Sequence, residues 1–356
     1  MKKQAFVLTL GVVMLSVVAV LGLLVDARAG KGLDEGGNVG GQETTIPAGE
    51  YKLSGPYTHK NLTIFLVHGK NVYEGRNFIT LQEAMTQKKV IVYETKTVNT
   101  LAIENVSSED IYVQAGDIVK GGQQDRMIGV DLIVPGHSGK MPISAFCVEH
   151  GRWSGRGEER AGVFSSSSDA VATKSIKLAA KSSVSQGEVW KSVTVAQDKL
   201  SQNVGTRVNS AVSESSLQLA VENGKVQETA EAYTKALSHI VNDSNDVIGY
   251  VFAINGKVNS ADVYGSSTLF KKLWPKLLKA NAVEAIAELQ SEKFAAPKPE
   301  QAKSFLSDSH KTKATEKDVS RRVGLATGED DENILFETRD RDRKGAWVHR
   351  NYIKKN

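Results

Sequence analysis

Short apolar runs separated by turn residues dominate the chain between residues 62 and 148. Runs of a few residues that are rich in Val, Ile and Tyr and bounded by Gly, Ser, Asp or Pro are typical of β-strands. One helix is expected among them, because Thr80 and Glu83 have the spacing of a capping box. The expected strands are Leu62–Val67, Val90–Tyr93, Leu101–Ile103, Ile111–Val113, Met127–Val134 and Met141–Val148.

Helical spacing replaces the strand pattern after residue 185. Ser185 and Glu188 form a second capping box, and apolar residues then recur every three or four positions from Val189 to Leu200. The same spacing from Val226 to Ile240 predicts another amphipathic helix. The serine-rich stretch 165–185 that precedes both helices is expected to be a loop or a weak strand.

A hairpin is the clearest local prediction in the second half. Val247–Ile254 leads into Asn255-Gly256, and the chain returns through Lys257–Val263. Asn-Gly between two such runs favours a type I′ turn, in which both central residues have positive φ. A further strand pair is expected in the tail, around Ile334–Phe336 and Ala346–Val348.

The hairpin is expected to lead into a helix that proline interrupts. The helix should start at Leu269, with Ser267 or Thr268 as its N-cap. Pro275 predicts a kink, or a break with Pro275 opening a second helix, because proline lacks the amide hydrogen that an interior helical position needs. The proline-containing stretch 295–300 is expected to end the helix.

This order of strands, then helices, then strands indicates an α+β fold rather than a doubly wound sheet. No internal repeat is visible, and we expect a single domain over residues 43–356. A Gly-rich stretch over residues 30–42 reads as a flexible linker ahead of it.

The first 29 residues have the pattern of an export signal. Lys2 and Lys3 precede a charge-free apolar segment over residues 5–25, and Ala27-Arg28-Ala29 fits a signal-peptidase site. The segment is also long enough to be a retained membrane anchor. In both cases we expect a periplasmic or extracellular protein that contacts the membrane only through this segment.

Charge and cysteine content exclude several classes of protein. The formal net charge of +4 is too small for the electrostatic footprint of a nucleic-acid-binding protein. A single cysteine, Cys147, excludes an intrachain disulfide, and the seven histidines are too scattered to predict a metal site. The mixed-charge runs Glu329–Glu332 and Arg339–Lys344 are expected to be solvated loops or surface strands.

Candidate chemistry is concentrated in two polar stretches at strand ends. Gly121–Arg126 lies between two expected strands, and Cys147–Trp153 ends the β series. Neither stretch contains a phosphate loop, a dinucleotide fingerprint or a nucleophile elbow.

Three functions remain open for this cluster. We expect non-catalytic binding of a small anionic ligand or a partner protein, with Gln124, Arg126, Glu149, Arg152 and Trp153 forming the site. The alternatives are a hydrolase that uses Cys147 as nucleophile or Glu149 as general base, and a purely structural envelope protein in which the cluster is buried and paired.

The same two stretches resemble a known family. The strings Gly121-Gly122-x-Gln124-x-Arg126 and Cys147-Val148-Glu149-x-Gly151-Arg152-Trp153 are similar to the signature of the ADP-ribosylglycohydrolase- and rhodanese-phosphatase-associated protein family. Weaker matches in the same order extend the resemblance over most of residues 53–352. The resemblance implies a link to ADP-ribose or to a phosphorylated, nucleotide-like ligand, but no demonstrated reaction.

Overall fold

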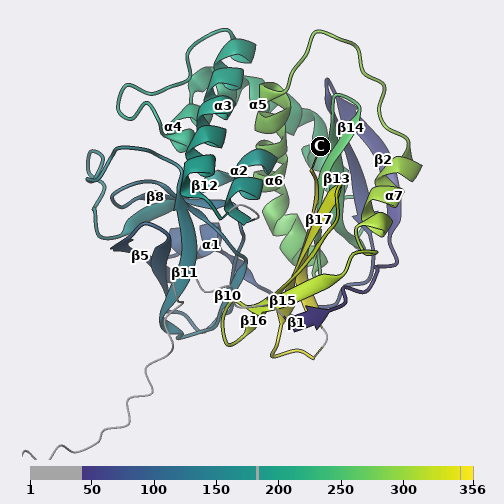
Figure 1. The fold of residues 1–356 in the computed structure, drawn as a ribbon, viewed down its shortest axis with the longest axis horizontal. Coiled ribbons are helices and arrows are strands. Elements are labelled where there is room, and N and C mark those ends of the chain that lie inside the picture. The colour runs from purple at the N-terminus through teal and green to yellow at the C-terminus, as the bar shows by residue number, and fades with distance from the viewer. Residues whose placement is uncertain (1–41, 182–183, 345, 356) are drawn as a thin grey trace, which may run out of the picture. The chain divides into compact units, whose positions relative to one another are not determined.

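The computed structural model describes residues 42–181, 184–344 and 346–355, and it confirms the α+β class. Sheets form the N-terminal half, helices occupy the middle of the chain, and strands return at the C-terminal end (Figure 1). The predicted signal or anchor at residues 5–25 lies outside the described residues. Within the described part of the chain, none of the helices is both long and apolar enough to span a bilayer.

A nine-stranded antiparallel sheet joins the start, middle and end of the chain. Helix α6 (Ser267–Ala287) covers one face through aromatic residues such as Phe270, and helix α7 (Pro299–Asp308) covers the other through Phe305. In spatial order the strands are β1 (Gln42–Thr44), β15 (Ala314–Asp318), β16 (Val323–Glu329), β17 (Asn333–Asp340), β18 (Ala346–Lys354), β14 (Lys257–Tyr264), β13 (Val247–Ile254), β3 (Leu62–His68) and β2 (Lys52–His59).

The two strand pairs predicted from local sequence are present in this sheet. β13 and β14 form the expected hairpin, and φ is 53° at Asn255 and 73° at Gly256, as a type I′ turn requires. β17 pairs with β18 in the tail, over more residues than the sequence indicated. Strands β2, β15 and β16 were not predicted, because their mixed polar and apolar residues lack a clean alternation.

The second sheet has six strands and curls until its two edges meet. Tyr93 on one edge forms an isolated antiparallel bridge with Val163, and the Glu94 amide donates a hydrogen bond of 3.0 Å to the Gly162 carbonyl. We call it the curled sheet. Its strands, in order, are β12 (Phe164–Val171), β8 (Asp117–Gly121), β9 (Arg126–Ile128), β11 (Gly139–Cys147), β6 (Thr100–Asn105) and β5 (Val90–Thr97).

A small three-stranded sheet lies beside the curled sheet. The expected strand Met127–Val134 is in fact two strands in two sheets, because Gly129–Asp131 turns the chain between them. The predicted capping box is present, since Thr80 caps helix α1 (Leu81–Thr86) and Glu83 bonds back to its amide. The three strands are β10 (Leu132–Val134), β7 (Ile111–Val113) and β4 (Ile79–Thr80).

The remaining helices form the middle of the chain. The stretch expected to be a loop or weak strand forms β12 and a helix, because Ile176, Ala179 and Ala180 give that helix a buried face. These helices are α2 (Lys174–Lys181), α3 (Gln186–Val204), α4 (Leu217–Val221), α5 (Gly224–Leu237) and the 3-10 turn η1 (Ser238–Val241).

The predicted break at Pro275 is wrong. α6 runs through Pro275 as one helix of 21 residues, and its N-cap is Ser266 rather than Ser267 or Thr268. Most of its side chains are buried, so tertiary packing on several sides outweighs the lost amide donor. The helix ends at Ala287, and Pro299 begins α7 instead of ending α6.

Candidate functional site

Arg126 occupies the end of the curled sheet, where its edges meet. Its Nη2 lies 3.2 Å from both carboxylate oxygens of Glu94 on β5, and its Nη1 donates to the Val98 carbonyl at 2.6 Å. Nη1 also lies 2.7 Å from the Sγ of Cys147 on β11. The side chain is fully buried. Arg126 therefore links β9 to β5 and β11 and has no free donor at the surface.

Cys147 is held as a neutral, buried thiol. Burial raises its pKa to about 11, although Arg126 acts in the opposite direction. The side-chain amide of Gln186, at the start of α3, donates to the Cys147 carbonyl and accepts from its amide, both at 2.8 Å. A protonated thiol with no access to solvent is a poor nucleophile.

Glu149 is engaged by a planar arginine fork. Nε and Nη2 of Arg152 each donate to one carboxylate oxygen at 2.7 Å, and the Asp125 amide donates to Oε2 at 2.9 Å. Burial raises the pKa of Glu149, but the bonds from Arg152 outweigh it and leave the pKa below its usual value. Burial, and then the charge of Glu149, raise the pKa of the neighbouring Asp125, which binds Arg156 at 3.1 Å.

Gln124 and Trp153 take no part in these pairs. Gln124 is fully buried, and neither atom of its amide has a hydrogen-bond partner in the described chain. Trp153 is 53% exposed on the loop that carries Arg152. The structure therefore brings the predicted residues to one end of the curled sheet, with both arginines already paired with carboxylates, although the Nε of Arg126 has no partner in the described chain.

An open pocket lies elsewhere, on the nine-stranded sheet, and the sequence did not reveal it. It encloses about 930 Å³ between the segment Thr44–Tyr51, strands β15, β17 and β18, and the loop after β17. We call it the sheet pocket. Its charged lining residues are Lys70, Arg339, Arg341, Arg343, Lys344 and Arg350, with Glu50, Glu316, Glu337 and Asp340.

An irregularity in β18 places an aromatic ring in the sheet pocket. The register shifts after the pair Thr338–His349, so that Arg339 pairs with Trp347 and Val348 is left over. Residues three apart in a regular strand point to opposite faces, whereas the extra residue turns Trp347 to the face of Arg350. The Arg350 guanidinium lies 4.3 Å from the centre of the Trp347 ring, in a cation–π contact.

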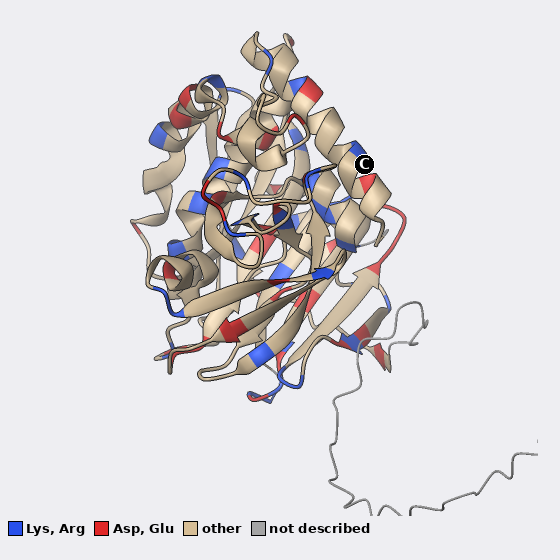
Figure 2. Ribbon diagram, turned by 90° about the vertical axis from the view of Figure 1, so that its left-hand side faces the viewer, with Lys and Arg blue, Asp and Glu red and all other residues tan. Residues whose placement is uncertain are grey.

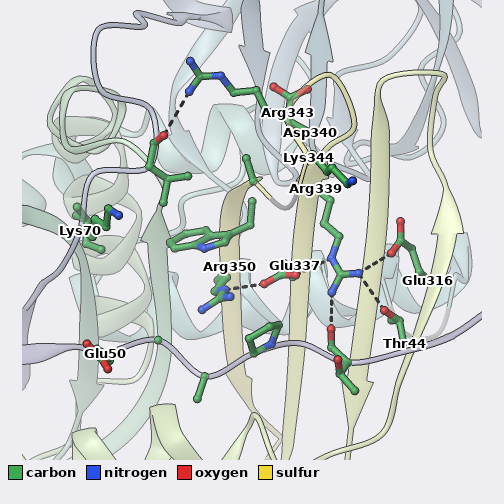
Figure 3. A pocket seen from close by; sticks show the side chains of 18 of the residues that line it. Thr44, Glu50, Lys70, Glu316, Glu337, Arg339, Asp340, Arg343, Lys344 and Arg350 are labelled. Atoms are coloured by element: carbon green, nitrogen blue, oxygen red, sulfur yellow. Dashed lines mark hydrogen bonds and ion pairs between the residues drawn. The ribbon is translucent and has the colours of Figure 1, made fainter.

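The cations of the sheet pocket fall into two groups. Arg339, Arg341 and Arg350 bond to carboxylates; Arg339, for example, lies 2.7 Å from both Glu316 and Glu337. Lys70, Arg343 and Lys344 have no carboxylate within 4.0 Å in the described residues. Figure 3 shows Lys70 across the pocket from Arg339 and Lys344, with Arg350 and Glu337 between them.

Comparison with known proteins identifies the family. The model of the ARG and Rhodanese-Phosphatase-superfamily-associated Protein domain matches residues 50–353. The chain belongs to this family. No curated protein and no solved structure matches it.

The match to the ARG and Rhodanese-Phosphatase-superfamily-associated Protein domain confirms the resemblance read from the two polar strings. It covers the whole end of the curled sheet and most of the sheet pocket. Residues 44–49, which form one wall of the pocket, precede the matched region. The charged run Arg339–Lys344 is the sequence signal for this pocket, although mixed charge of this kind predicts solvated loops or surface strands.

Proposed function

We propose that this protein binds a phosphorylated, nucleotide-like small molecule in the sheet pocket without transforming it. The observation that carries the proposal is the group of cations without a carboxylate partner, Lys70, Arg343 and Lys344. Phosphate oxygens accept strong charge-assisted hydrogen bonds from lysine and arginine. Arg343 donates to the Val72 carbonyl at 3.3 Å, but none of the three has an anionic partner in the described chain. An anionic ligand would supply that partner.

The rest of the pocket favours an anion as well. Its lining holds six cationic side chains and four carboxylates, and Glu316 and Glu337 are already bonded to arginine. Asp340 is buried and its carboxylate pairs with Arg322. The electrostatic potential in the pocket is therefore expected to be positive, which raises the local concentration of anions.

Trp347 supports a ligand with a flat group. Its indole lines the pocket, and Arg350 fixes the ring from one side. Aromatic rings beside cations suit a base or ring attached to a phosphate, because stacking and charge pairing then act together. The family's association with the ADP-ribosylglycohydrolase and rhodanese-phosphatase superfamilies is consistent with such a ligand.

The state of Cys147 and Glu149 supports binding over hydrolysis. A nucleophilic cysteine needs a lowered pKa and access to substrate, whereas the pKa of Cys147 is raised to about 11 and its side chain is buried. A general base needs a free carboxylate, whereas both oxygens of Glu149 are bonded to Arg152. Because residues 5–25 have the apolar pattern of an export signal or membrane anchor, we propose that binding takes place outside the cytoplasm.

A thermal-shift panel tests the proposal and identifies the class of ligand. The purified protein is heated with pyrophosphate, AMP, ADP-ribose, ribose 5-phosphate or adenosine. A ligand at a hundred times its dissociation constant should add about 2.7 kcal/mol, a rise of a few degrees in the midpoint. We expect AMP to raise the midpoint more than ribose 5-phosphate, and adenosine to have little effect.

Two variants and a control assign the shift to the sheet pocket. Arg343→Ala and Lys344→Ala should each weaken phosphate binding about tenfold, the effect of losing one charge-assisted bond. Lys191→Ala, which removes an exposed charge on α3, should leave binding unchanged. If no anion shifts the midpoint, or if all three variants respond alike, the sheet pocket is not the site.

A further inference from the structure

The loop over the end of the curled sheet is attached in an unusual way. We call residues 150–162 the arginine loop. Within the described chain, no backbone hydrogen bond joins residues 151–161 to any residue outside the loop. None of these residues is buried, and Trp153 is 53% exposed. Neither backbone pairing nor apolar packing therefore holds the loop down.

Two arginines supply the attachment. Arg152 bonds to Glu149 at 2.7 Å, and Arg156 bonds to Asp125 at 3.1 Å. Both carboxylates are completely buried, and both arginines are about 10% exposed. The loop therefore contributes its own guanidinium groups to an anionic site made by the rest of the chain. Figure 2 shows positive and negative residues interleaved on this side of the molecule.

Buried polar atoms without partners occur in the segments that carry and adjoin the two carboxylates. Gln124, next to Asp125, has neither amide atom bonded, and the Oε1 of Gln218 on α4 is also unpaired. α4 adjoins the site, because the hydroxyl of its N-cap, Ser216, donates to Asp125 at 3.1 Å. Buried polar groups normally have partners, so these unpaired atoms keep hydrogen-bonding capacity for another molecule. The part of the chain beneath the loop is thus an incomplete polar site.

We propose that the arginine loop is a removable cover over a cation-binding site formed by Asp125 and Glu149. The ligand is a guanidinium or primary-amine group, which replaces Arg152 and Arg156 on the two carboxylates when the loop lifts. Gln124 supplies a further hydrogen bond to it. This site is independent of the sheet pocket and takes a ligand of the opposite charge.

The donor set favours an organic cation over a metal ion. In the described residues no group of three or more His, Cys, Asp or Glu side chains is placed to hold a metal. The bidentate contact of Arg152 shows that the oxygens of Glu149 accept a planar fork of two N–H groups. Buried carboxylates stripped of both arginines would need a replacement of equal charge.

Chemical rescue tests the proposal. In the full-length double variant Arg152→Ala/Arg156→Ala, both carboxylates lose their partners, and the melting midpoint should fall by roughly 5 °C or more. Methylguanidinium at ten times its dissociation constant should then restore about 2–4 °C. The wild-type protein should bind methylguanidinium at least tenfold more weakly, because its own arginines compete for the site.

Matched variants separate rescue from general salt effects. Arg160→Ala removes an exposed arginine from the same loop, and it should neither lower the midpoint nor create a response to methylguanidinium. Adding Glu149→Gln to the double variant should abolish the rescue. Circular dichroism establishes that each variant is folded. A folded double variant that does not respond, or that responds equally to tetramethylammonium chloride, would overturn the proposal.

Discussion

At the scale of single residues, His349 shows how a buried charge can be held in the core. Its Nδ1 lies 2.8 Å from Asp131, its Nε2 lies 3.0 Å from Asp262, and the ring of Tyr264 stacks on it at 4.5 Å. Burial lowers the pKa of His349, but the two aspartates outweigh burial and raise the pKa above its ordinary value. Burial raises the pKa of each aspartate, yet nearby cations, His349 among them, hold both well below the usual range.

These shifts predict how stability depends on pH. A histidine whose pKa is raised on folding stabilises fully below its unfolded pKa of about 6.5, and the contribution is lost as the pH rises through the folded value. The aspartates, whose pKa values are lowered, stabilise above about pH 4 and lose this effect as the pH falls. The charged triad should therefore stabilise most between about pH 4 and 6.5.

Urea unfolding of wild type and His349→Gln across this range measures the effect. The difference in free energy of unfolding between the two proteins should be largest near pH 5.5 and shrink toward pH 9. Lys181 is a nearby base that also loses its proton within this pH range, because burial lowers its pKa to about 8. A difference that grows from pH 5.5 to pH 9 would contradict a charged His349.

At the scale of elements, Arg126 connects strands of the curled sheet at the point where its two edges meet. It joins β9 to Glu94 on β5 and to Cys147 on β11, and the three strands meet where the sheet edges come together. Removing one partner of a buried ion pair leaves the other charge uncompensated, which typically costs about 3–5 kcal/mol. Arg126→Ala should therefore destabilise the protein by this amount.

Urea unfolding midpoints test whether the Arg126–Glu94 ion pair stabilises the curled sheet. Arg160→Ala, which removes an exposed arginine, is the control. Replacing both partners, as in Arg126→Met/Glu94→Met, should recover much of the loss, since no charge is then left buried. If Arg126→Ala behaves like Arg160→Ala, the ion pair does not hold the sheet closed.

The same scale shows which elements sequence can predict. The capping box at Thr80, the N-cap at Ser185 and the Asn255-Gly256 hairpin depend on residues close together in the chain, and the structure contains them. At Ser185 only half of the predicted capping box is found, because its hydroxyl accepts from the Glu188 amide and no return bond from the Glu188 side chain is present in the described chain. Pro275 misled the prediction because the surroundings of α6, rather than its local hydrogen bonds, keep that helix continuous. Helix propensity therefore predicts an element poorly where tertiary packing determines whether the helix forms.

At the scale of the whole molecule, the two polar sites differ in how far sequence could reveal them. The stretches Gly121–Arg126 and Cys147–Trp153 already suggested a cluster, since each adjoins a strand end. Their pairing could not be read from sequence, because Glu94 lies on β5, far away in the chain, and Arg156 lies in a loop with no regular spacing to Asp125. The sheet pocket depends on sheet order, which brings Thr44, Lys70 and Arg343 together from distant segments.

We propose that the phosphorylated ligand binds in the sheet pocket and not at the end of the curled sheet beneath the arginine loop. Hydrogen–deuterium exchange with and without saturating AMP tests it most directly, because it locates the footprint without any substitution. We predict slower exchange in residues 44–51 and 339–344 and no change in residues 150–162. Protection confined to residues 121–126 and 150–162, with no change at residues 44–51, would show that AMP binds at the end of the curled sheet instead.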